Sequence, residues 1–138
     1  MSWTPANEIP LGTIAPEFSL PAPDGAVWSL DKLEGARAVL VAFISTRCPF
    51  MKHIARGFAA FAREYGPKGL AVVAINSNGK ETMEEMADEI ARFSYSFPYV
   101  KDADQSVAAA YRASCTPDFY LFDMDHRLYY HGQFDDSN

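Results

Sequence analysis

The chain has 138 residues, enough for one compact domain and short for two, so we expect a single domain over residues 1–138. Hydrophobic residues make up 49% and charged residues 22%, a composition that excludes a disordered chain. The 12 Lys and Arg against 18 Asp and Glu give a formal net charge of −6. Because the basic residues also form no run, we expect no nucleic-acid partner.

The longest uninterrupted apolar segment is 38–44, which is too short to span a bilayer. Residues 1–5 contain neither a basic cluster nor an apolar stretch, so we expect no secretory signal, no membrane partner and a cytoplasmic location. The cytoplasm keeps thiols reduced, and the 2 cysteines, Cys48 and Cys115, are too few for a disulfide framework. Each thiol is therefore either an inert core sulfur or a redox group.

The N-terminal third predicts a hairpin followed by a buried strand. Residues 17–20 and 26–29 have extended patterns on either side of a turn rich in proline and glycine. Ser29 is expected to cap a short helical turn that runs through Leu33. The apolar run 38–44, rich in β-branched residues, is typical of a central strand covered on both faces.

A long amphipathic helix is predicted to follow, with Pro49 in its first turn. Its apolar stripe consists of Phe50, Ile54, Phe58, Phe61 and Tyr65. Residues 70–76 form a second buried strand, and the Ser77–Gly79 loop is expected to cap the next helix. The stripe of that helix, which we interpret as core, consists of Met83, Met86, Ile90 and Phe93.

The C-terminal part predicts a short extended segment, a third helix and a second hairpin. Asp102 or Asp104 is the expected cap of the helix. Residues 119–122 and 128–131 form the expected hairpin strands. Strands that alternate with helices predict a parallel sheet between helical layers, which the hairpin closes with antiparallel strands.

We expect no helix after this hairpin, because only residues 134–138 follow it. The exposed apolar face near 119–122 and 129–130 is then expected to be covered by more chain or by a second copy. His126 and His131 of the hairpin are expected on the surface.

Cys48 stands between the buried strand 38–44 and the helix that begins near Pro49. The free backbone N–H groups and the positive end of that helix favour a thiolate over a thiol. The carboxyl ends of strands in such sheets are also where ligands usually bind. A free cysteine is most often a space-filling core residue, but this placement favours a reactive one.

Several segments of the chain carry motifs of a known family: 15–20 with 24–25, 38–43 with 48–54, 74–78, 115–119 and 132–136. They resemble the thioredoxin-like redoxins of the alkyl hydroperoxide reductase/thiol-specific antioxidant (peroxiredoxin-like) family. The resemblance covers nearly the whole chain. It implies an α/β thioredoxin fold of three layers, α/β/α, with a mixed central sheet and an N-terminal β-hairpin extension, here without the usual C-terminal helix.

The resemblance implies a thiol-dependent oxidoreductase with Cys48 as the nucleophile. Its substrate would be a peroxide or a protein or small-molecule disulfide, in an antioxidant or thiol–disulfide exchange role. Cys115 or an external thiol reductant would resolve the product, without a metal or an organic cofactor. Thr116 and Pro117 resemble the cis-proline loop, which would hold Thr116 beside Cys48 and expose its backbone to an extended partner chain.

Three departures affect this expectation. The second cysteine of a thioredoxin Cys-x-x-Cys motif is replaced by Met51, so dithiol exchange within the motif is impossible. The segments 48–54, 74–78, 115–119 and 132–136 resemble one bacterial redoxin-like subgroup in particular, whose members often carry a cysteine where this chain has Ser45. The arginine of peroxidases is also absent near Pro117, which leaves Arg47 or Arg112 as substitutes.

Neighbouring side chains have functional and structural interpretations. The hydroxyls of Ser45 and Thr46 either donate to a Cys48 thiolate or only solvate the loop. Lys52 and His53 follow Cys48 closely, but the helical spacing favours a solvent-exposed position for both.

Two classes of function therefore remain open. The first is the redoxin-type oxidoreductase, acting as a monomer or a homodimer. The alternative is a redox-inert thioredoxin-fold module that binds extended peptides at Thr116 and Pro117, an alternative that Met51 favours. The pH at which Cys48 ionises distinguishes the two classes.

Overall fold

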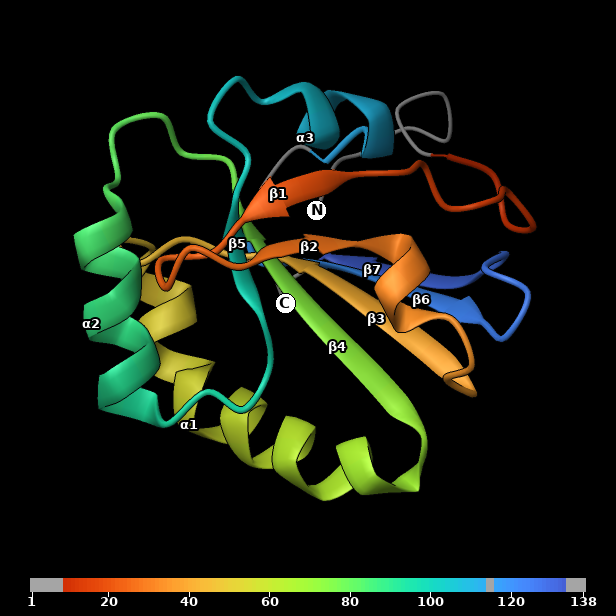
Figure 1. Cartoon of the computed structure of the whole chain (residues 1–138), viewed down its shortest axis with the longest axis horizontal. Helices are drawn as coiled ribbons and strands as arrows, with labels where there is room; N and C mark the ends of the chain where they lie inside the picture. The colour runs from red at the N-terminus through yellow and green to blue at the C-terminus, as the bar shows by residue number, and fades with distance from the viewer. Residues whose placement is uncertain (1–8, 114–115, 134–138) are drawn as a thin grey trace.

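The computed structural model describes residues 9–113 and 116–133, which build a five-stranded sheet between helical layers (Figure 1). The strands are β3 (Ala38–Phe43), β4 (Leu70–Asn76), β5 (Tyr99–Lys101), β6 (Asp118–Asp123) and β7 (Leu128–Gln133). Their order is β5-β4-β3-β6-β7. β3 is parallel to β4, and β4 to β5, whereas β6 is antiparallel to β3 and β7. The predicted mixed sheet with β3 at its centre is confirmed.

The side chains of β3 alternate between two separate cores, which is why this strand is apolar throughout. Val39, Val41 and Phe43 belong to the core shared with the N-terminal segment and α3 (Ser106–Tyr111). Leu40 and Ala42 belong to the core under α1 (Pro49–Tyr65) and α2 (Met83–Phe93). The sheet therefore has helices on both faces, as predicted.

The N-terminal segment forms the predicted hairpin as a separate two-stranded sheet. Its strands are β1 (Ser19–Pro21) and β2 (Val27–Ser29), paired antiparallel. The predicted short helical turn follows as the 3₁₀ turn η2 (Leu30–Leu33). Ser29 precedes this turn, but its side chain makes no capping hydrogen bond, contrary to expectation.

The buried face of α1 differs from the predicted stripe. The buried residues are Met51, Ala55, Phe58, Ala59 and Ala62. Phe61 and Tyr65 were predicted in the stripe, yet they are 42% and 39% exposed and pack against each other with ring centroids 4.8 Å apart. Alanine side chains and Phe58 fill the face of the helix toward the sheet, and Phe61 and Tyr65 lie at the edge of that face.

The caps of the next two helices differ from those predicted. α2 begins after Thr82, which forms a reciprocal capping box with Glu85, and not after the Ser77–Gly79 loop. A threonine followed three residues later by a glutamate is the sequence signal for this cap. The Asp102 carboxylate accepts hydrogen bonds from Val107 and Ala108 at the start of α3, as a predicted cap would, although the helix begins only at Ser106.

The face formed by α1, β6 and β7 carries an apolar groove of about 410 Å³. Phe119, Leu121 and Tyr130 line the groove on the sheet side, and Phe58 and Phe61 line it on the helix side. This is the apolar face that the sequence predicts. That more chain or a second copy covers this face remains a prediction.

His131 lies on β7 but, contrary to the prediction, is not a surface residue, because its side chain is only 3% exposed. Its partner, Asp118, is fully buried at the start of β6. The contact with Asp118 accounts for the burial of the polar His131 ring.

No helix in the described ranges is long and apolar enough to cross a membrane.

Candidate active site

Cys48 is the residue that caps the N-terminus of α1, immediately after the loop that leaves β3. Its backbone is extended, and its carbonyl accepts a hydrogen bond from the Lys52 N–H, the first bond of the helix. Pro49 occupies the first helical position, where its missing N–H costs no hydrogen bond. The thiol is half-buried and is a free cysteine.

The sulfur of Cys48 lies against the loop that leads into β6. Cys48 Sγ donates a hydrogen bond to the carbonyl oxygen of Thr116 at 3.4 Å. The peptide bond between Thr116 and Pro117 is cis. Two segments 68 residues apart in the sequence thus meet at the thiol, as the resemblance implies.

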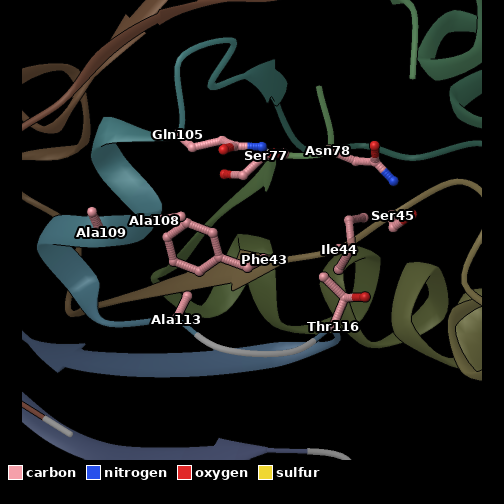
Figure 2. A pocket seen from close by; sticks show the side chains of 10 residues that line it. All are labelled: Phe43, Ile44, Ser45, Ser77, Asn78, Gln105, Ala108, Ala109, Ala113 and Thr116. Carbon is pink, nitrogen blue, oxygen red and sulfur yellow. Dashed lines mark hydrogen bonds between the residues drawn. The ribbon is translucent and has the colours of Figure 1, made fainter. Parts of the chain in front are cut away.

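A cavity of about 610 Å³ adjoins this contact, since Thr116 and Ser45 both line it. Figure 2 shows the polar side chains of Ser77, Asn78 and Gln105 along one side and Thr116 on the opposite side. The remaining wall is apolar and consists of Phe43, Ile44, Ala108, Ala109 and Ala113. The space beside the sulfur is therefore lined by uncharged residues.

Ser45 and Thr46 are both buried, and their hydroxyls donate to Glu81, not to the Cys48 sulfur. The Thr46 hydroxyl and the Thr46 backbone N–H each lie 2.7 Å from Glu81 Oε1. Ser45 Oγ also accepts a hydrogen bond from the Arg47 N–H. A buried carboxylate accepts these hydrogen bonds more strongly than a half-buried thiol does, which explains the difference from both predicted roles.

Glu81 is a site residue that the sequence analysis missed. It is 3% exposed, and its carboxylate also accepts hydrogen bonds from the side-chain amides of Asn76 at 2.7 Å and Asn78 at 2.9 Å. The Lys101 ammonium group donates to the backbone carbonyl of Glu81 at 2.9 Å and to the Asn76 side chain at 3.1 Å. This set of residues links the ends of β4 and β5 to the loop before Cys48.

The pKa values of this network follow from burial and hydrogen bonding. Burial raises the pKa of Glu81, but hydrogen bonds from Ser45, Thr46 and Asn76 outweigh it and leave the pKa below its ordinary value. Burial lowers the pKa of Lys101, and the charge of Glu81 opposes that shift. Glu81 is therefore a carboxylate at neutral pH, and its charge is stabilised by uncharged hydrogen-bond donors.

The positively charged residues predicted near the thiol bind Glu85 or are exposed at the surface. The Arg47 guanidinium binds Glu85 through two hydrogen bonds, at 2.9 and 3.0 Å. The hydrogen bonds from the Arg47 side chain and the Thr82 N–H lower the pKa of Glu85 to about 2. Lys52 and His53 are exposed on α1, as predicted. Arg112 ends α3 in a left-handed backbone conformation with an exposed side chain.

A second buried polar group lies directly after Pro117. Asp118 Oδ1 is 2.5 Å from His131 Nε2, and the Tyr120 hydroxyl lies 3.2 Å from Asp118 Oδ2. The rings of Tyr120 and His131 stack with centroids 4.1 Å apart. The hairpin register, which pairs Tyr120 with His131, is the signal that could have predicted this group.

The remaining predicted residues are Met51 and Cys115. Met51 is completely buried in the core under α1, at the position of the second cysteine in a Cys-x-x-Cys motif. Cys115 lies outside the described residues, so its role as a resolving thiol remains a prediction. Among the described residues, His, Cys, Asp and Glu side chains form no group of three or more that could hold a metal ion.

A thiol at the first turn of the helix after the central strand, facing a loop with a cis proline, defines the thioredoxin-like redoxins. The chain belongs to the AhpC/TSA family, because the profile of that family matches residues 11–131. No protein with a curated description matches the sequence.

Solved structures agree with this assignment. A hypothetical protein from Sinorhizobium meliloti 1021 is 51% identical, with a TM-score of 0.89 over 95% of this chain and 74% of that chain. An uncharacterized conserved protein from Geobacillus kaustophilus is 43% identical, with a TM-score of 0.87 over 93% of this chain and 71% of that chain.

The thioredoxin domain of a thiol-disulfide oxidoreductase from Bacteroides vulgatus is 19% identical, with a TM-score of 0.77 over 90% of this chain and 89% of that chain. This similarity shows that the predicted thioredoxin fold is correct. Family membership supports thiol-dependent oxidoreductase activity in general.

Proposed function

We propose that the protein is a thiol–disulfide oxidoreductase in which Cys48 attacks a disulfide substrate. The observation that carries the proposal is the position of the Cys48 sulfur. It lies at the N-terminus of α1, 3.4 Å from the Thr116 carbonyl oxygen and next to a cavity of about 610 Å³. Reactive cysteines commonly occupy helix N-termini, and the cavity provides space for the substrate.

The reaction proceeds in two exchanges. The Cys48 thiolate attacks one sulfur of the substrate R–S–S–R′, so that a Cys48–S–S–R bond forms and R′–S⁻ leaves and takes a proton from solvent. An external thiol, R″–SH, then loses its proton and attacks the mixed disulfide. This step releases R–S–S–R″ and regenerates the Cys48 thiolate. Cys115 is the intramolecular alternative to the external thiol.

A disulfide is favoured over a peroxide as the substrate. Reduction of a peroxide R–O–O–H transfers OH to Cys48 and releases R–O⁻, a charge that requires hydrogen-bond donors near the sulfur. The candidate donors Ser45 and Thr46 bind Glu81, and Arg47 binds Glu85. Peroxide reduction, and with it an antioxidant role, is therefore the weaker part of the proposal.

The partner that fits this site is an extended, uncharged segment carrying the disulfide. The cavity beside Thr116 offers uncharged polar groups from Ser77, Asn78 and Gln105 and an apolar wall around Phe43. An extended peptide would bind here through its main chain, so the site could accept protein disulfides in segments of different sequence. Small disulfides fit the same space.

The second candidate is a redox-inert module that binds extended peptides at Thr116 and Pro117. The observation that favours it is Met51, which is buried where a second active-site thiol would stand. Such a module would bind a peptide without a covalent step.

Mass spectrometry of the intact protein separates these candidates. The reduced protein is mixed with a stoichiometric amount of oxidised glutathione or of hydrogen peroxide, beside the Cys48→Ser and Cys115→Ser variants. The proposal predicts a glutathione adduct on Cys48 in the wild type and in Cys115→Ser. An unmodified Cys48 supports the inert module, and sulfenic acid formed faster than the adduct supports a peroxidase.

The Cys115→Ser variant also tests how the product is resolved. A loss of both free thiols in the wild type, with a lasting adduct in Cys115→Ser, assigns resolution to Cys115. A lasting glutathione adduct on Cys48 in the wild type, with one free thiol remaining, would exclude Cys115 as the resolving thiol.

Three expectations complete the proposal. The protein acts in the cytoplasm, where external thiols are abundant. Residues 1–138 form one redoxin domain. A second copy covers the apolar groove beside Tyr130 and Phe61, and sedimentation of the wild type against Tyr130→Ser tests this homodimer.

A further inference from the structure

The loop between β3 and α1 is held in place almost residue by residue. The Ile44 N–H donates to the Ile75 carbonyl at 3.0 Å, which continues the pairing of β3 with β4. Ser45 and Thr46 bind Glu81, and the Arg47 N–H binds the Ser45 hydroxyl at 3.2 Å. Residues 44–46 are thus bonded directly to β4 or to Glu81, and Arg47 is connected to Glu81 through the Ser45 hydroxyl.

We propose that Glu81 is the positioning residue of this site: its carboxylate fixes residues 45–47 and thereby sets where the Cys48 sulfur lies relative to Thr116. Glu81 acts through this loop and not on the substrate. The inference rests on the proposed function, in which Cys48 is the reactive group.

Glu81 can position the loop because it is itself held by the sheet. Asn76, the last residue of β4, donates its side-chain amide to Glu81 Oε1 and accepts from Lys101 on β5. The Glu81 backbone N–H binds the Asn78 carbonyl at 3.1 Å, and its carbonyl accepts from Lys101. The carboxylate therefore transmits the position of β4 and β5 to the loop before Cys48.

A carboxylate is required at this place because it accepts five hydrogen bonds. Glu81 Oε1 accepts from the Thr46 N–H, the Thr46 hydroxyl and Asn76, while Oε2 accepts from Ser45 and Asn78. In Glu81→Gln, one oxygen becomes an NH₂ group that faces donors, so at least one side of the network must break. The side chain keeps its size, so the effect of the substitution reports the loss of hydrogen bonds and not a loss of packing.

The chain offers a matched control in Glu89. This second glutamate is also buried, at 7% exposure, and its carboxylate accepts a hydrogen bond from the Tyr95 hydroxyl at 2.9 Å. It lies within α2, outside the Glu81 network that holds residues 45–47. Glu89→Gln repeats the chemical change in another buried place.

The test compares two rates for Cys48 in each variant. Reaction with oxidised glutathione requires a positioned thiolate, whereas alkylation by iodoacetamide requires only an accessible thiolate. In Glu81→Gln we expect the glutathione rate to fall about tenfold to a hundredfold and the iodoacetamide rate to stay within about threefold of the wild type. Glu89→Gln should change neither rate. A merely structural role would move both rates together.

Hydrogen exchange of the Thr46 amide provides a second readout. We expect its protection to be lost in Glu81→Gln and kept in Glu89→Gln. If Glu81→Gln does not fold, Ser45→Ala removes two hydrogen bonds of the same network, the one to Glu81 and the one from the Arg47 N–H, and leaves the bonds of Thr46 to Glu81. It should change both readouts in the same direction by a smaller amount.

Different results would contradict the proposed function and the positioning role of Glu81. A wild type that does not react with oxidised glutathione contradicts the proposed function, and Thr46 exchange then still decides the role of Glu81. A folded Glu81→Gln with an unchanged glutathione rate and unchanged Thr46 protection would overturn the positioning role alone.

Discussion

The Cys48 sulfur and the Thr116 carbonyl oxygen lie 3.4 Å apart, within one hydrogen bond of each other. Each comes from a different part of the sheet, Cys48 from the end of β3 and Thr116 from the start of β6, and these strands are direct neighbours. The antiparallel pairing of Phe43 with Asp118 brings the two ends to the same edge. The meeting of thiol and loop is therefore a consequence of sheet topology.

Met51→Cys is expected to restore a pair of thiols that form a disulfide with each other. A disulfide needs Cα atoms about 4.4–6.8 Å apart, and residues three apart on a helix are neighbours at about that distance. In a Cys115→Ser background, mild oxidation should remove both free thiols of the variant. Loss of the buried Met51 side chain should lower the free energy of unfolding of the reduced form by about 1–3 kcal/mol.

Ala55→Cys is the control for this prediction. Ala55 is buried on the same helix but seven residues from Cys48, which is about 10 Å along the helix axis. Its thiol should stay free under the same oxidation. Equal thiol loss in both variants would point to bonds between molecules and contradict the expected local disulfide.

The strand order could be predicted because it depends on local patterns. The runs 38–44 and 70–76 are apolar throughout, which requires cover on both faces, and a helix between them requires parallel pairing. The position of Cys48 followed from the same patterns. The Glu81 network could not be predicted, because its contacts join residues 35 and 36 positions apart and depend on how a loop packs.

Glu89→Gln is expected to raise the free energy of unfolding at pH 7 but not at pH 3. Burial raises the pKa of Glu89 above its ordinary value of about 4.3, so the folded state holds the proton more tightly than the unfolded state. Stability is therefore lost as the pH rises through the folded pKa. Glutamine carries no such cost and still accepts from Tyr95. Urea unfolding at both pH values measures this, and an equal effect at pH 3 and pH 7 would contradict it.

Tyr120→Phe is expected to lower the free energy of unfolding by about 1–3 kcal/mol. The Tyr120 hydroxyl lies 2.8 Å from the Tyr111 carbonyl oxygen and also contacts Asp118, so its loss leaves buried acceptors with one donor fewer. Tyr129→Phe is the control, since Tyr129 is 71% exposed and the substitution should change stability by less than about 0.5 kcal/mol. Chemical denaturation compares the two, and similar losses would show that the buried hydroxyl has no special role.

The central claim is that Cys48 is a nucleophile toward disulfides. The most direct measurement is the rate at which the reduced protein forms a mixed disulfide with oxidised glutathione, followed by mass spectrometry of the intact protein and of its peptides. The account predicts a single adduct, on the peptide that contains Cys48, formed faster than on the same protein unfolded in urea, and absent from Cys48→Ser. A folded protein whose Cys48 reacts no faster than in the unfolded chain would contradict it.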